Sequence, residues 1–287
     1  RYPQRVRAVI LDGVVPADLA LGPDVALDAQ RALDAAFDRC ARDQHCARQF
    51  PGIAQQFTAL LGRLRQEPVT VSIPDPLTGE SAATRLDKER LAGAVRLLSY
   101  SDETTSTLPL LIHEAQSLRE PRGLAAQYLM VKRTMDVQIA EGMHFSVVCS
   151  EDAPRWDSRP VSDEELARTY MGTTFMDAMR AICALWPRGP VDEDFSVPLQ
   201  SDIPTLILSG TNDPVTPPQY GEQVLRGLGA AQHLVLVGQG HGQLVVGCIP
   251  RLMAQFIDAG SAESLDAQCI KNVAPAPFML SRSAPAP

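Results

Sequence analysis

Two stretches near the C-terminal end decide the fold: residues 204–218 read PTLILSGTNDPVTPP, and residues 233–242 read HLVLVGQGHG. Each begins with a short apolar run, which is typical of a strand buried on both faces of a parallel sheet. Each run ends in a loop rich in glycine, proline or asparagine. In open α/β sheets, ligands and catalytic groups gather at the carboxyl ends of the strands. We therefore expect these two loops to form a site together.

The two loops carry the two parts of a catalytic pair. Asp213 follows the first strand, and His241 follows the second. A carboxylate can hold an imidazole in one tautomer, so that the imidazole takes a proton from a nucleophile and passes it to the leaving group. An aspartate between Asn212 and Pro214 is often only a turn former. Its pairing with a histidine between two glycines, which allow a tight exposed loop, favours the catalytic interpretation.

The rest of the chain predicts an α/β sheet with a long helical insertion. Residues 6–15, VRAVILDGVV, indicate another buried parallel strand. Apolar residues then recur at three- and four-residue spacing, interrupted by one edge strand between Pro68 and Pro76. We expect residues 1–17 to form a core strand, residues 18–196 a helical cap, and residues 197–287 the remaining core with both loops. Predicted helices include 87–99, 108–118, 122–141, 162–171 and 173–185, with N-caps at Asp87, Ser162 and Thr173, and the Pro/Ala-rich tail 274–287 is expected to be extended or frayed.

Composition excludes several classes of protein. The 287 residues are 45% hydrophobic and 21% charged, which is typical of a folded globular protein. The net charge of −8 and the absence of a basic block argue against nucleic-acid binding. No apolar run approaches the ~20 residues of a membrane span, and no targeting segment is visible at the start. The five histidines show no metal-binding spacing, so we expect neither a metal nor another cofactor.

The six cysteines suggest three local disulfides. Spacing makes Cys40–Cys46, Cys149–Cys183 and Cys248–Cys269 plausible pairs, although six cysteines allow fifteen pairings. If the pairs form, the compartment is extracytoplasmic. The alternative is six buried, reduced thiols.

Four motifs resemble one enzyme family. Residues 2–14 (YPQRVRAVILDGV), 146–152 (SVVCSED), 210–217 (GTNDPVTP) and 238–242 (GQGHG) are similar to the α/β-hydrolase family of secreted bacterial tripeptidyl aminopeptidases and proline iminopeptidases, with a TAP-like C-terminal region. The resemblance implies the C-terminal part of an α/β-hydrolase sheet with a large helical cap, and a secreted or periplasmic serine aminopeptidase. It implies that Asp213 and His241 are catalytic, and that Glu151 and Asp152 bind the free α-amino group of a peptide, with Glu151 favoured of the two.

One feature departs from the family pattern. The nucleophilic serine of such enzymes lies in a G-x-S-x-G turn, and these 287 residues contain no such motif. The family pattern would place it upstream of Arg1, so that the chain would be the C-terminal part of a longer hydrolase. Alone, such a chain should not carry out acyl transfer.

Several alternatives stay open. The same fold could act on an ester or amide, and a nucleophilic Asp in place of Ser would favour epoxide or haloalkane hydrolysis. The chain could also be a catalytically incomplete fragment, or a module that pairs with a polypeptide carrying the missing N-terminal half. An open sheet edge would then favour association of the isolated chain.

Overall fold

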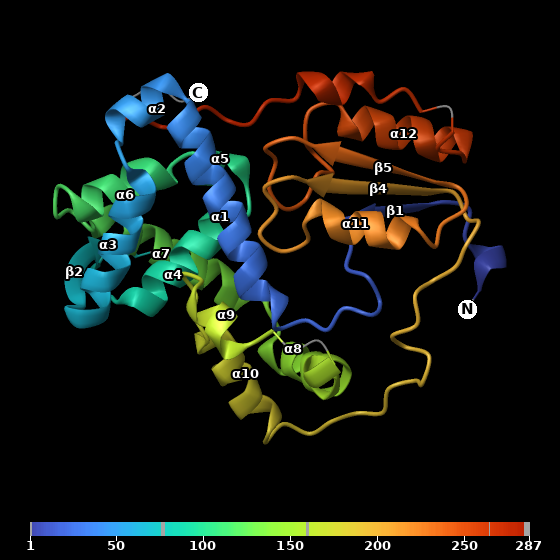
Figure 1. Ribbon diagram of the computed structural model, residues 1–287, viewed down its shortest axis with the longest axis horizontal. Helices are drawn as coiled ribbons and strands as arrows, with labels where there is room; N and C mark the ends of the chain where they lie inside the picture. The colour runs from blue at the N-terminus through green and yellow to red at the C-terminus, as the bar shows by residue number, and fades with distance from the viewer. Residues whose placement is uncertain (1, 76–77, 159–160, 264, 284–287) are drawn as a thin grey trace.

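The computed structural model describes residues 2–75, 78–158, 161–263 and 265–283. Its centre is a parallel sheet of three strands, β1 (Val9–Asp12), β4 (Thr205–Gly210) and β5 (Ala231–Leu236), in the order β1-β4-β5 (Figure 1). The three apolar runs of the sequence therefore form neighbouring parallel strands, as predicted. The central strand β4 is buried along its whole length. Within the described ranges β1 pairs with β4 alone, so its outer edge is free.

Side chains point alternately to the two faces of a strand. The buried strand β4 therefore presents side chains on both faces of the sheet, and a helix covers each face. The leucines of β4 and β5 pack against α12 (Ile249–Ala259) on one face. On the other face, Ser209 and His233 lie against α11 (Pro218–Leu225), which approaches closely through a glycine. Figure 1 shows the two helices on opposite sides of the strands.

A long, mainly helical segment connects β1 to β4 and has its own apolar core. It lies beside the sheet, toward the left of Figure 1. Its helices are α1 (Asp24–Arg42), α2 (Gln44–Gln49), α3 (Ile53–Gln66), α4 (Lys88–Leu98), α5 (Asp102–Thr105), α6 (Leu108–Gln116), α7 (Arg122–Gln138), α8 (Glu141–Val147), α9 (Asp163–Ala167) and α10 (Thr174–Cys183). Shorter helical turns are η1 (Pro3–Arg5) before β1, η2 (Val148–Asp152) and η3 (Ala153–Ser158) in the segment, and η4 (Gln268–Asn272) after α12.

The helical segment contains a hairpin where the sequence predicted one edge strand. That strand, β2 (Val69–Pro74), pairs antiparallel with β3 (Ser81–Leu86). The small residues at the start of β3 conceal its alternation, although Thr84 and Leu86 are buried.

Two of the three predicted helix caps are confirmed. The Asp87 side chain accepts a hydrogen bond from Arg90 N, and Ser162 forms a capping box with Glu165. Thr173 lies at the N-cap position of α10, as predicted, but its backbone is already helical and its side chain makes no capping bond.

All three cysteine pairs form disulfides, namely Cys40–Cys46, Cys149–Cys183 and Cys248–Cys269. The first lies within the helical segment and joins α1 to α2. The second joins η2 to α10, and the third joins the start of α12 to η4. The expectation of oxidised local pairs is therefore confirmed, and that of reduced thiols is not.

The C-terminal tail crosses back to the helical segment (Figure 1). Ala276 N donates to Asp102 Oδ2 at 2.7 Å, and Met279 N donates to Ser106 O at 3.1 Å. The Arg39 guanidinium lies 4.0 Å from the centre of the Phe278 ring. Residues 274–281 lie outside any helix or strand and cross the molecule as extended chain, as predicted, and 282–283 form a turn. This tail is attached rather than frayed, and the prediction for 284–287 lies outside the described residues. No helix in the described ranges is long and apolar enough to cross a membrane.

Candidate active site

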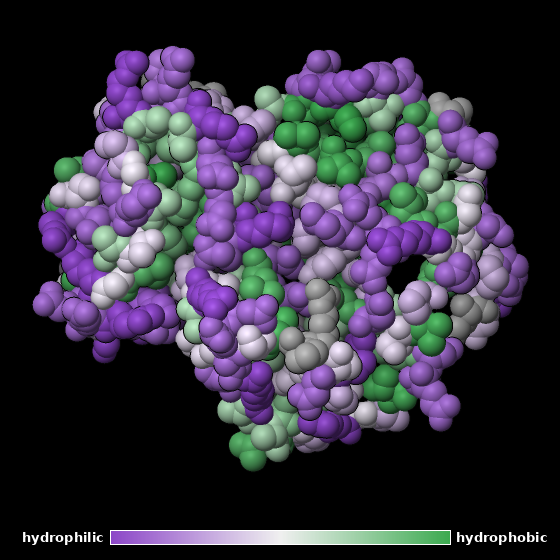
Figure 2. Space-filling view, viewed as in Figure 1, coloured by the Kyte–Doolittle hydropathy of each residue, from purple (hydrophilic) through white to green (hydrophobic). Residues whose placement is uncertain are grey.

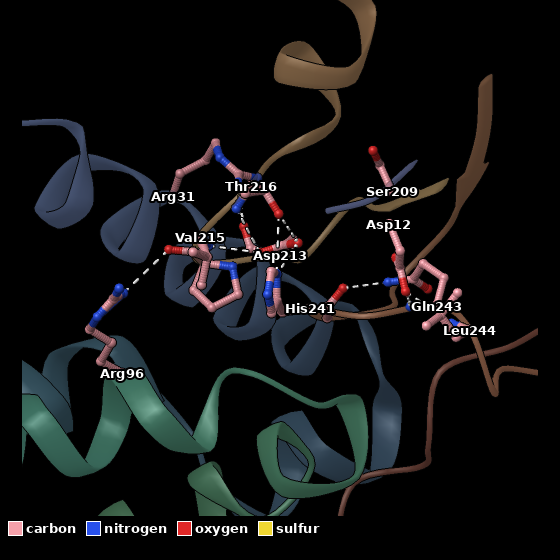
Figure 3. A network of polar contacts seen from close by, with 12 residues as sticks. Asp12, Arg31, Arg96, Ser209, Asp213, Val215, Thr216, His241, Gln243 and Leu244 are labelled. Carbon is pink, nitrogen blue, oxygen red and sulfur yellow. Dashed lines mark hydrogen bonds and ion pairs between the residues drawn. The ribbon is translucent and has the colours of Figure 1, made fainter. Parts of the chain in front are cut away.

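Asp213 and His241 meet at the carboxyl edge of the sheet. Asp213 lies in the turn that follows β4, and His241 lies in the loop that follows β5. Because the two strands are parallel neighbours, both loops emerge at the same edge. His241 Nδ1 lies 2.9 Å from Asp213 Oδ2 (Figure 3). The structure therefore brings together the pair that the sequence singled out.

The Asp213 carboxylate is buried and fully hydrogen-bonded. Its Oδ1 accepts from the backbone N–H of Val215 at 2.7 Å and of Thr216 at 2.9 Å. Its Oδ2 accepts from the Thr216 hydroxyl at 2.8 Å as well as from His241. Burial alone would raise the pKa of Asp213, but the hydrogen bond and charge of His241, together with the donors of Thr216, lower it. Asp213 therefore stays ionised beside the imidazole.

The His241 imidazole is fixed on one side and open on the other. Its backbone N–H donates to Tyr100 O at 2.6 Å, and its ring and the Tyr100 ring form a T-shaped pair with their centroids 5.5 Å apart. Gly13, just after β1, is so close that a Cβ there would lie 2.9 Å from His241 Cε1. The side chain is 32% exposed, and within the described ranges Nε2 has no hydrogen-bond partner. Nε2 is thus available to a reacting group.

The pKa of His241 is raised, mainly by its hydrogen bond to Asp213. Burial lowers it, the charges of Asp213 and Asp12 raise it, and the charge of Arg96 lowers it. This is the electrostatic environment of a base whose protonated form is stabilised by a neighbouring carboxylate.

The helical segment also supports the Asp213 loop. Arg31, on α1, donates to Thr211 O at 3.0 Å and to Asp213 O at 2.5 Å. Arg96, on α4, lies 3.5 Å from Pro214 O (Figure 3). Sequence reasoning missed these arginines and Tyr100, because they lie in the helical segment, far from the motifs. It also missed roles for Asp12 and Thr216, although both lie inside the motifs that were quoted.

Of the two acidic residues predicted to bind substrate, Asp152 lines a pocket and Glu151 does not. Asp152 accepts a hydrogen bond from Leu21 N at 2.9 Å and pairs with Arg155 at 3.3 Å, and burial raises its pKa. The Glu151 side chain is partly exposed, and its backbone carbonyl accepts a bond from Arg155. The pocket has a volume of about 150 Å³ and includes Asp24, Asp28, Arg96, Asp152, Val215 and Tyr220 among its lining.

The pocket is acidic and lies near the candidate catalytic dyad, by which we mean Asp213 and His241. Val215 lines it only two residues after Asp213, and the Arg96 that lines it is the arginine whose charge lowers the pKa of His241. Burial raises the pKa of Asp28 to about 6, although the Tyr220 hydroxyl donates to it at 2.6 Å. The lining therefore includes three aspartates and one arginine, and two of these aspartates, Asp28 and Asp152, also form ion pairs with Arg31 and Arg155.

No serine or cysteine in the described ranges is hydrogen-bonded to His241. The Thr216 hydroxyl lies 3.1 Å from His241 Nδ1, on the Asp213 side of the ring and not at the open Nε2, and it also donates to Asp213. Ser209 lies on the neighbouring strand, but it is 1% exposed and its hydroxyl lies 2.9 Å from Nε2 of His233, beneath α11. That serine–histidine pair is part of the core. The described residues also contain no group of three histidine, cysteine or acidic side chains placed to hold a metal ion.

The chain is similar to a family of known proteins and to several curated relatives. Residues 168–269, which include both loops, match a family model described as TAP-like protein. The chain is 28% identical to serine protease Hip1 of Mycobacterium tuberculosis (strain ATCC 25618 / H37Rv), over 93% of this chain and 54% of that protein. It is 26% identical to carboxylesterase B of the same strain, over 80% of this chain and 45% of that protein.

The chain thus spans about half the length of the curated relatives it matches. It is homologous to a serine protease and to a carboxylesterase, and its C-terminal region is TAP-like. The predicted resemblance to the α/β-hydrolase superfamily is confirmed.

Proposed function

We propose that this chain, with its α/β-hydrolase sheet and TAP-like C-terminal region, supplies the acid and the base of a serine hydrolase. One observation carries the proposal. The buried Asp213 carboxylate holds Nδ1 of His241, while Nε2 of the same ring has no partner in the described part of the chain and the ring is one-third exposed. This is the geometry of the orienting acid and general base of an acyl-transfer triad.

In the proposed mechanism, His241 Nε2 takes the proton of a serine hydroxyl as the oxygen attacks the substrate carbonyl. The imidazolium, stabilised by Asp213, then gives this proton to the leaving group, and an acyl-serine remains. A water molecule activated by His241 hydrolyses the acyl-serine and restores the free base. His241 stays hydrogen-bonded to Asp213 during both the acylation and the deacylation step.

We place the nucleophilic serine on a strand and turn that pair with the free edge of β1. Three observations support this placement. The 287 residues contain no G-x-S-x-G turn, the outer edge of β1 has no partner among the described residues, and His241 lies beside Gly13 at the end of β1. We call the 287 residues together with that strand and turn the assembled hydrolase. The strand can belong to the same polypeptide or to a partner that carries the first half of the sheet.

The substrate that we propose is a peptide with a free N-terminus, with the helical segment acting as the cap over the site. The acidic pocket supports this choice, because a buried ammonium group needs paired carboxylates. Asp152 is the principal binding residue in this proposal, and Glu151 beside it is the second. The similarity to carboxylesterase B favours an ester as the second candidate substrate. The three disulfides support a secreted or periplasmic location.

The experiment that tests the substrate class compares Asp152→Asn with wild type in the assembled hydrolase. The substrates are one short peptide with a free amino group and its N-acetylated form. We expect KM for the free peptide to rise on the order of 10-fold, because a charge-assisted bond to the ammonium group is lost. KM for the acetylated form should stay near its wild-type value.

The matched control is Asp157→Asn, an exposed aspartate on the neighbouring turn η3. It should leave both KM values unchanged. Equal effects of Asp152→Asn on the two substrates would exclude amine recognition, and faster turnover of simple esters than of either peptide would favour the esterase.

A further inference from the structure

The carboxylate of Asp12, the last residue of β1, binds the loop that carries His241. Its Oδ2 accepts two hydrogen bonds from consecutive backbone amides, Gln243 N at 2.7 Å and Leu244 N at 3.1 Å (Figure 3). These amides begin two residues after His241. A single carboxylate oxygen therefore joins the end of one strand to the loop that leaves another.

The loop that carries His241 is also held before the imidazole, where Asn212 N donates to Gln239 O at 2.9 Å and Gln243 Nε2 donates to Gly240 O at 2.7 Å. Gly238, Gly242 and Gly247 adopt positive φ angles of 78°, 88° and 50°, and Val245 is 87% exposed. On the N-terminal side of the imidazole, His241 N donates to Tyr100 O. On its C-terminal side, Asp12 is the corresponding anchor. The position of a base on such a glycine-rich loop depends on anchors of this kind.

The second oxygen of Asp12 is buried without a partner. Within the described ranges, Oδ1 has no hydrogen-bond donor. An ionised oxygen removed from water is costly unless a donor reaches it, so an orphan of this kind requires an explanation. Asp12 ends the strand whose outer edge is free, which is where a further strand would bring backbone or side-chain N–H groups.

We propose that Asp12 is a positioning residue that fixes His241 through the loop amides with Oδ2 and receives, with Oδ1, a donor from the strand and turn that pair with β1. The carboxylate then sets the distance between the base and the segment that carries the nucleophile. The first half of this proposal concerns the 287 residues themselves. The second half rests on the proposed function.

The first experiment uses the 287-residue chain and requires no activity. Hydrogen exchange measured by mass spectrometry reports the backbone amides of the peptide containing Gln243 and Leu244 in wild type, Asp12→Asn and Asp12→Ala. Asparagine keeps one carbonyl oxygen as an acceptor, whereas alanine keeps none. We expect protection of these amides in wild type and in Asp12→Asn, and its loss in Asp12→Ala. Equal exchange in wild type and Asp12→Ala would overturn the proposal.

A second readout separates positioning of the base from a merely structural role. Exchange of the imidazole Cε1–H over a pH series gives the pKa of His241. The charged groups that face this ring are Asp213, Asp12 and Arg96. We expect the pKa of His241 to be lower in Asp12→Asn than in wild type, because one negative charge is lost. The control is the exposed Asp18→Asn, whose side chain binds only Gln223, and it should leave the pKa unchanged. An unchanged pKa in Asp12→Asn would overturn the proposal.

The assembled hydrolase tests the role of Oδ1. In Asp12→Asn we expect kcat to fall on the order of 100-fold with KM unchanged. The NH2 group that replaces Oδ1 cannot accept the donor from the added segment, so the nucleophile is displaced from His241, which slows the chemical step and not binding. An unchanged kcat in an active enzyme would contradict this half of the proposal. If the wild-type assembly itself is inactive, the proposed function fails, and the two exchange experiments still decide whether Asp12 positions His241.

Discussion

At the scale of single residues, the proposed catalysis depends on the contacts of His241. A general base must be neutral to take a proton, so kcat/KM of the assembled hydrolase should rise with pH through the pKa of His241. Its hydrogen bond to Asp213 raises that pKa, so the midpoint should lie above the ordinary value for an exposed histidine. A pH–rate profile between pH 5 and 9, a range set by about two units on either side of a histidine pKa, measures it. A flat profile, or a midpoint below the ordinary value, would contradict the assignment.

Gly13 provides a second test at this scale. Its φ is +65°, and a Cβ at this position would lie 2.9 Å from His241 Cε1 and 2.8 Å from Thr216 Oγ1. Gly13→Ala should therefore displace the imidazole and lower kcat on the order of 100-fold, with a loss of about 1–2 kcal/mol of stability from the left-handed backbone. Gly79→Ala is the matched control, because its φ is +73° and a Cβ there would meet nothing within 4 Å. If the two variants have equal activity, the close contact with the imidazole does not matter.

At the scale of elements, α1 braces the loop that carries Asp213. Arg31 bonds two carbonyls of that loop, so Arg31→Met should lower the free energy of unfolding by about 1–2 kcal/mol and should also reduce kcat. Arg42→Met serves as the control, because Arg42 lies on the same helix, is exposed and bonds only Asp38 O. Denaturant unfolding measures both variants. Equal stability of the two would show that the bonds of Arg31 contribute nothing.

Strands with a clear run of apolar residues could be predicted from the sequence, and strands without one could not. The strands at Thr205–Gly210 and Ala231–Leu236 were predictable because their apolar runs end in turns, and their adjacency placed Asp213 beside His241. Strand β3 (Ser81–Leu86) was missed because its first three residues, a serine and two alanines, are too small to show an apolar alternation. The bonds of Arg31 and Tyr100 were beyond prediction, since they depend on how the helical segment packs against the sheet.

At the scale of the whole molecule, the free edge of β1 and the apolar surface at the carboxyl end of the sheet should make the isolated chain associate. Figure 2 shows hydrophobic surface beside α12 near the end of β5. Val237, directly after β5, and Leu244 and Val245, in the loop that carries His241, are exposed. Unpaired strand edges and apolar patches favour self-association. Sedimentation velocity over a range of concentrations should show oligomers of the 287-residue chain. A monomer at all concentrations would contradict the proposal that a further strand covers β1.

The central claim is that Asp213 and His241 activate a serine that lies on the strand and turn beside β1. The most direct measurement is intact mass spectrometry of the assembled hydrolase after reaction with a serine-directed fluorophosphonate probe, in wild type and in His241→Ala. We predict one adduct in wild type, mapped to a serine outside residues 1–287, and its loss in His241→Ala. The exposed His45→Ala is the control and should label like wild type. The absence of an adduct in wild type, or labelling that does not depend on His241, would contradict the claim.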